Sequence, residues 1–159
     1  QIRSVATLHG MLNHADGAEG VALQSYVGRI GTILDQSLSG ALTVTAQAVP
    51  ARVSAMHAAA IGTIMNEFAS NSLKHAFPDG RLGHVDFRVE HAGDGGLRLV
   101  CADDGIGFGW DSVDHDASLG LRVMQATAES LGGTLQPQDS DAGLVLAVSF
   151  ALDPDLNPA

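Results

Sequence analysis

The chain has 159 residues, enough for one domain with a substantial hydrophobic core. Its composition, 45% hydrophobic and 16% charged, is typical of a folded chain and excludes a disordered one. The formal net charge of −10 argues against general binding to nucleic acid or to anionic membranes, because both require a basic surface. Cys101 is the single cysteine, so no disulfide can form within the chain, and no apolar run reaches the roughly 18 residues of a membrane-spanning helix. We therefore expect a cytoplasmic domain with no nucleic-acid partner and no membrane contact.

The first part of the chain is predicted to be largely helical. Apolar residues recur at helical spacing over residues 2–12, and this helix begins without a capping residue, which predicts a fragment of something longer. A second amphipathic helix is expected over residues 23–38. Residues 42–46 then alternate like a half-buried strand.

The remaining elements predict a layered α/β domain. In chain order they are a helix from about Ser54 to Phe77, a strand over 85–89, a hairpin loop at 92–96, a strand over 97–101, a mobile loop from 108 to 118, a helix over 119–131, and strands near 134–136 and 144–150. This order indicates a two-layer α/β sandwich with helices on one face of a mixed sheet. We expect this domain to cover residues 20–152 and the tail, residues 153–159, to be disordered.

The central helix carries the most informative pattern. Its apolar side chains Ile61, Ile64, Met65 and Phe68 are expected to face the core.

On the same helix, four chemically active side chains are spaced to share one face. Glu67 and Asn71 lie at i and i+4, and Lys74 or His75 follows one turn later. A carboxylate beside an amide oxygen suits a hard cation such as Mg²⁺, and the basic pair suits the phosphates that accompany it. The alternative interpretation is a solvated helix face without a ligand.

Two glycine-containing segments add to this pattern. Residues 103–107 read Asp-Asp-Gly-Ile-Gly at the end of a strand, where glycine permits a sharp turn and a carboxylate can accept a hydrogen bond from an exocyclic amine such as that of adenine. Residues 118–121 read Ser-Leu-Gly-Leu at a helix start, which can offer backbone N–H groups to phosphate. Taken singly, an ordinary Gly-rich turn and a Ser N-cap with a packing glycine are the alternatives.

Together, in this order, the three segments resemble the Bergerat ATP-binding fold. This fold is shared by sensor histidine kinases, type II topoisomerases and certain chaperones and DNA-repair proteins. Residues 66–75 resemble the N box, residues 103–107 the first glycine box and residues 118–123 the second. Within the group, the sequence of residues 66–78 is most similar to that of histidine kinases of the subfamily allied to the HWE kinases. Residues 2–12 resemble the end of that subfamily's second dimerisation helix, so residues 1–16 are assigned to it.

The resemblance implies a role for each residue of the N box. Asn71 would ligate Mg²⁺, with Glu67 orienting a water or acting as a base beside it. Lys74 and His75 would contact phosphate oxygens.

The resemblance also implies an ATP pocket around the glycine boxes. Asp103 would accept a hydrogen bond from the adenine amine, and Gly105 and Gly107 would shape the adenine pocket. The phosphates would lie against a helix N-terminus, under a lid formed by residues 108–117; the residues implied there are Ser118, Leu119, Gly120 and Leu121.

The chain departs from the family pattern in three respects. Gly143-Leu144 stands where such kinases usually carry Gly-Thr, so one hydroxyl contact is missing. The lid is short. No phosphoacceptor histidine is evident, since the first dimerisation helix is absent and His9 and His14 are read as surface residues.

The sequence therefore predicts the catalytic, ATP-binding region of a sensor histidine kinase. Its cofactors would be ATP and Mg²⁺. Its partners would be the dimerisation helices of the same kinase, which is expected to be a homodimer at full length, and a response regulator. The alternatives are a degenerate docking or phosphotransfer module that no longer binds ATP, and a serine kinase of the anti-sigma-factor type.

Overall fold

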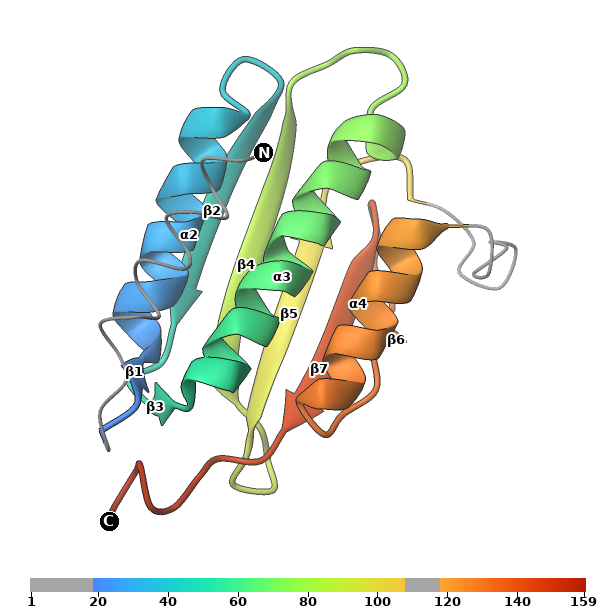
Figure 1. Cartoon of the computed structure of the whole chain (residues 1–159). Helices are drawn as coiled ribbons and strands as arrows, with labels where there is room; N and C mark the ends of the chain where they lie inside the picture. Colours follow the sequence, from blue (N-terminus) through green and yellow to red (C-terminus); the bar gives the residue numbers. More distant parts are fainter. Residues whose placement is uncertain (1–18, 108–117) are drawn as a thin grey trace.

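The computed structural model describes residues 19–107 and 118–159. Three helices of this part of the chain cover one face of a five-stranded sheet (Figure 1). The elements in chain order are β1 (Val21–Ala22), α2 (Leu23–Ser37), β2 (Leu42–Ala48), β3 (Arg52–Val53), α3 (Ala55–Asn71), a π-helix η1 (Ser72–Ala76), β4 (Gly83–His91), β5 (Leu97–Asp103), α4 (Leu119–Ser130), β6 (Gln136–Pro137) and β7 (Val145–Phe150). The predicted two-layer α/β sandwich is confirmed.

The sheet is mixed, as predicted. Its strand order is β2-β4-β5-β7-β6, in which β2 and β4 run parallel and the other neighbouring pairs antiparallel. The β4–β5 pair is a hairpin in which Phe87 lies opposite Cys101. Gly95 in the hairpin loop has a φ of +85°, a conformation that glycine adopts without strain. The amino end of β4 and the carboxyl end of β5 lie at the end of the sheet where the helix that α3 begins comes to its end and where α4 starts.

The core lies between the sheet and the helices. The four α3 side chains predicted to face inward, Ile61, Ile64, Met65 and Phe68, are all fully buried. The Phe68 ring packs edge-to-face on Phe87 of β4, with ring centroids 5.9 Å apart. Such pairs attach α3 to the middle of the sheet, so the polar residues on its last turns are held on a rigid element.

Helix α2 packs unusually closely on strand β2. A Cβ built on Gly31 would lie 2.5 Å from Ala46 Cβ, so a side chain at this position would force the two elements apart. The Asp35 carboxylate also accepts a hydrogen bond from the Val44 amide at 2.8 Å. This bond pairs a backbone group on the outer edge strand, which helps to protect that edge.

A small two-stranded sheet and the C-terminal tail meet at Arg52, and neither feature was predicted. Strands β1 and β3 pair antiparallel, with Ala22 opposite Arg52. The Asn157 side chain accepts from the Arg52 amide and donates to the Arg52 carbonyl, both at 2.8 Å. Residues 153–159 were expected to be disordered, but in the structure they are held by this reciprocal pair of hydrogen bonds, which pattern reasoning on an exposed, proline-containing tail does not reveal.

Two predicted features lie outside the described residues. They are the dimerisation-helix end, assigned to residues 1–16, and the lid over residues 108–117. Within residues 19–107 and 118–159, none of the helices combines the length and the apolar character required to cross a bilayer.

Candidate nucleotide site

The last turns of α3 bring polar side chains to one end of the sheet. Helix α3 begins where predicted, next to Ser54, whose Oγ accepts from the His57 amide at 3.1 Å, and it continues into the π-helix η1. Asn71 and His75 line the same pocket. Lys74 is exposed and is not part of the pocket lining. Of the two basic residues predicted for this face, the structure therefore brings His75 to the pocket. Insertions of π-helix are frequent at functional sites.

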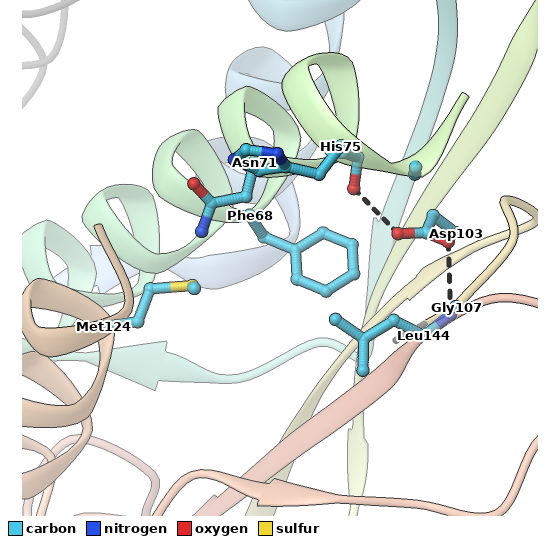
Figure 2. A pocket seen from close by; sticks show the side chains of 9 residues that line it. Phe68, Asn71, His75, Asp103, Gly107, Met124 and Leu144 are labelled. Atoms are coloured by element: carbon cyan, nitrogen blue, oxygen red, sulfur yellow. Dashed lines mark hydrogen bonds between the residues drawn. The ribbon is translucent and has the colours of Figure 1, made fainter. Parts of the chain in front are cut away.

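Asp103 at the end of β5 has a carboxylate that is buried and fully engaged. Its side chain is 7% exposed. Oδ1 accepts from the backbone amides of Gly105 at 3.0 Å and Leu144 at 3.1 Å, and Oδ2 accepts from the Ser72 hydroxyl at 2.9 Å. The dashed lines on Asp103 in Figure 2 mark the bonds to Ser72 and Leu144. Three donors from three separate elements hold this carboxylate in one orientation at the pocket wall.

The glycines beside Asp103 permit close backbone approach, as predicted for Gly105 and Gly107. A Cβ on Gly105 would lie 2.5 Å from the Ala76 carbonyl oxygen. Gly107 has a φ of +68° and lies against the Gly143 carbonyl. The Ile106 amide donates to the Ala76 carbonyl at 3.0 Å, which attaches this turn to the end of η1. The first glycine segment is therefore packed directly against the end of the N-box helix.

The start of α4 contacts the N-box side chains. Ser118 caps the helix, since its Oγ accepts from the Leu121 amide at 3.4 Å. A Cβ on Gly120 would lie 3.1 Å from both Asn71 Oδ1 and Glu67 Oε2. The structural alternative for this segment, a Ser N-cap with a packing glycine, thus holds, and the same glycine brings the helix start against Glu67 and Asn71.

The other two members of this segment occupy different environments. Leu119 is exposed at 75%, whereas Leu121 is buried in the core. The Leu121 side chain is therefore unavailable to a ligand, and its amide already donates to the Ser118 cap.

The pocket enclosed by these elements is small. It has a volume of about 20 Å³, enough for about one water molecule. Figure 2 shows the Phe68 ring, the Met124 side chain and Leu144 together with Asn71 and Asp103. Ser72, Phe68 and Met124 were not predicted as site residues, and Leu144 was noted only for the hydroxyl contact that it lacks. A serine on the otherwise apolar inner face of a helix was the one signal that could have indicated Ser72.

The thiol next to the site is not a nucleophile. Cys101 is fully buried on β5, two residues before Asp103. Burial, and secondarily the charge of Asp86, raises the pKa of the Cys101 thiol far above its usual range. The thiol is therefore protonated at neutral pH and acts as a core side chain.

The oxygen ligands beside Gly120 suit a magnesium ion that is shared with phosphates. Among the described residues, no group of three or more His, Cys, Asp or Glu side chains is placed to hold a metal by itself. Glu67 and Asn71 contribute one carboxylate and one amide oxygen at the same spot. Mg²⁺ usually keeps several waters and takes only one or two protein ligands with substrate phosphates, so this donor set fits it.

Comparisons with known proteins agree with this geometry. No family model matches the chain. The chain is 29% identical over 134 residues to the blue-light-activated histidine kinase 2 of Erythrobacter litoralis, covering 83% of this chain and 39% of that protein. The structure matches the histidine kinase domain of the Erythrobacter litoralis EL346 blue-light-activated histidine kinase with a TM-score of 0.80 at 26% identity, over 98% of this chain and 74% of the other. The ATP-binding domain of PrrB from Mycobacterium tuberculosis shares the fold, with a TM-score of 0.59 at 18% identity, over 84% of this chain and 96% of that domain.

The fold is thus that of histidine kinase ATP-binding domains. The chain is a homologue of the blue-light-activated histidine kinase, and the resemblance to the subfamily allied to the HWE kinases is confirmed. It spans less than half the length of that relative.

Proposed function

We propose that this chain is the ATP-binding catalytic domain of a two-component sensor histidine kinase. It would transfer the γ-phosphoryl group of ATP to a histidine outside this fragment, on a dimerisation helix of the same homodimeric kinase. A response regulator would then receive the phosphoryl group. A cytoplasmic location and the assignment of residues 1–16 to a dimerisation helix and 20–152 to the ATPase domain are part of the same proposal.

The buried carboxylate of Asp103 is the observation that carries this proposal. It lies in the wall of a pocket that Asn71 and His75 also line, and Gly120 adjoins Asn71 from the opposite helix. A buried acceptor for an exocyclic amine, an oxygen pair for Mg²⁺ and the first turn of a helix are groups of the kinds that contact a magnesium nucleotide.

In the proposed complex each residue acts on a different part of the nucleotide. Asp103 accepts from the adenine amine in the pocket shaped by Gly105 and Gly107. Asn71 ligates Mg²⁺, and Glu67 orients a water or acts as a base. Bound Mg²⁺ supplies neutralisation of the phosphate charge.

The phosphates would be held by two groups of residues. Lys74 contributes a positive charge at the end of η1, and the His75 imidazole can donate a hydrogen bond to a phosphate oxygen. The first turn of α4, in the segment Ser118, Leu119, Gly120 and Leu121, contributes backbone N–H groups, of which the Leu121 amide already donates to the Ser118 cap. Phosphoryl transfer depends mainly on such positioning and charge neutralisation.

The small volume of the pocket favours a second candidate, a docking module that does not bind ATP. An adenine ring does not fit into about 20 Å³, so Phe68, Met124 or Leu144 must move for a nucleotide to enter. Leu144 is 9% exposed and fills part of the space beside Asp103.

Calorimetric titration with ATP, with and without Mg²⁺, separates the two candidates. The kinase proposal requires saturable binding that Mg²⁺ strengthens and that favours ATP over GTP. Asn71→Ala should abolish the Mg²⁺-dependent part of binding and leave thermal unfolding unchanged, whereas Asn66→Ala, one turn earlier and outside the pocket, should retain it. Absence of binding at millimolar ATP would select the docking module.

Transfer itself needs the full-length kinase. Incubation with γ-labelled ATP should give a phosphorylated histidine, recognised because a phosphoramidate is stable to base and labile to acid. Protein that binds Mg·ATP yet acquires no such label would contradict the kinase proposal.

A further inference from the structure

Ser72 and Asp103 form an isolated buried polar pair. Within residues 19–107 and 118–159, and apart from Tyr26 and Cys101, they are the two polar or charged side chains that are buried, at 3% and 7% exposure. They are also bonded to each other, since Ser72 Oγ donates to Asp103 Oδ2 at 2.9 Å. The buried Ser72 hydroxyl thus donates to a carboxylate and not to a carbonyl of its own helix. A hydrogen bond to a charged group is stronger than one between neutral groups, so this arrangement is favoured.

The hydrogen-bond capacity of the pair shows what it can offer to a ligand. Each carboxylate oxygen has about two acceptor sites. Oδ1 of Asp103 already accepts from the Gly105 and Leu144 amides, so its sites are occupied. Oδ2 accepts from Ser72 and keeps one site. The single Ser72 proton is used, so its oxygen can act only as an acceptor. At this point the pocket wall therefore presents acceptors and no donor.

We propose that Ser72 is a specificity-determining residue that makes this wall select a purine with an amine at C6. This inference rests on the proposed nucleotide-binding function. An amine at C6 can donate to the remaining site on Asp103 Oδ2. An oxygen at C6 would place its lone pairs against those of Oδ2.

Ser72 also prevents the pocket wall from offering a hydrogen-bond donor to a base with an oxygen at C6. To donate to a C6 oxygen, its hydroxyl would have to release Asp103 Oδ2. A buried carboxylate oxygen would then lose its side-chain donor, which is costly where water is excluded. Sites whose buried polar groups are left unpaired by an analogue reject that analogue strongly. Without the hydroxyl, a water molecule would fill the space, and water can turn to donate to either base.

The test compares ATP with inosine triphosphate, which carries an oxygen in place of the amine at C6. Wild-type protein should bind ATP more tightly than inosine triphosphate. Ser72→Ala should narrow this ratio by about tenfold, the size of effect expected for one hydrogen bond to a charged group, and the change should come from tighter binding of inosine triphosphate. Ser72→Cys keeps nearly the same volume with a weak donor, so it should narrow the ratio in the same direction and carries the test if the alanine variant does not fold.

A matched serine supplies the control. Ser70 lies on α3, two residues before Ser72 and outside the pocket lining, and Ser70→Ala should leave the ratio unchanged. Equal weakening of ATP and inosine triphosphate by Ser72→Ala would assign Ser72 a purely structural role and overturn the inference. A wild-type preference for ATP that survives both Ser72 variants would overturn it as well, with the proposed function intact. A wild-type protein with no preference for ATP would overturn both.

Discussion

Gly120, in the first turn of α4, lies against the Asn71 side chain of α3, so that a Cβ at position 120 would lie 3.1 Å from Asn71 Oδ1. The same Cβ would lie 3.1 Å from Glu67 Oε2. These separations are shorter than ordinary van der Waals contact. Because Gly120 has no side chain, the Glu67 and Asn71 oxygens that we assign to Mg²⁺ can both lie against the start of α4.

Gly120→Ala should therefore weaken Mg²⁺-dependent nucleotide binding while the domain stays folded. The added methyl displaces Glu67 and Asn71 by a few tenths of an ångström, and we expect a loss of about tenfold in affinity, because Mg²⁺ demands near-ideal ligand geometry. Calorimetry with Mg·ATP measures the effect. Gly28→Ala, on α2, is the matched control, since no atom of the described residues lies within 4 Å of a Cβ built there. Unchanged affinity in Gly120→Ala would contradict the assigned metal position.

Gly143→Ala should strongly destabilise the fold. Gly143 has a φ of +73°, and a Cβ there would lie 1.9 Å from the Asp103 carbonyl oxygen. Backbone strain of about 1–2 kcal/mol adds to a clash that only movement of β5 or β7 can relieve. We expect a loss of about 3 kcal/mol or more in the free energy of unfolding, measured in urea.

Gly80 separates the two contributions to that loss. Its φ is +76°, but a Cβ there meets nothing within 4 Å. Gly80→Ala should therefore cost only the strain, about 1–2 kcal/mol. Equal losses for the two variants would show that the clash at Gly143 is relieved without cost.

Tyr26 should make the domain lose stability in alkaline solution. Burial raises the pKa of its phenol from 10.0 to about 12. Above pH 10 the unfolded chain releases this proton and the folded chain retains it, so the free energy of unfolding falls as pH rises from about 10 to 12, by up to about 1.4 kcal/mol per pH unit.

Comparison with Tyr26→Phe isolates this contribution from other groups that titrate at high pH. The Tyr26 hydroxyl has no hydrogen-bond partner within the described residues, so its removal should be neutral or slightly stabilising at pH 7. Urea unfolding at several pH values should show a shallower decline for the variant. Parallel curves would mean that the phenol is as accessible in the folded protein as in the unfolded one.

Asn157→Ala should lower stability without affecting nucleotide binding. The substitution removes both 2.8 Å hydrogen bonds to the Arg52 backbone, and each is worth about 1 kcal/mol. The tail and β3 lie at the end of the sheet away from the pocket (Figure 1), so ATP affinity should be unchanged. Asp155→Asn, on an exposed residue of the same tail, should leave both quantities unaltered. A combined loss of stability and affinity would link this end of the domain to the site.

The periodicity of the sequence was sufficient to determine the layers of the fold. Residues such as Ile61 and Phe68 recur at helical spacing and Val85 and Phe87 alternate, and in both cases burial of one face requires the observed element. The spacing of Glu67 and Asn71 likewise placed them on one helix face, because i and i+4 positions are adjacent on any α-helix. Local patterns of this kind depend only on neighbouring residues.

Tertiary structure alone decided which side chains meet. The choice between Lys74 and His75 depended on the η1 turn, and the bond from Ser72 to Asp103 joins residues 31 positions apart. The reciprocal bonds between Arg52 and Asn157 span 105 positions. Such pairings are set by how β5, β3 and the helices pack against one another, and the sequence near either residue carries no trace of its partner.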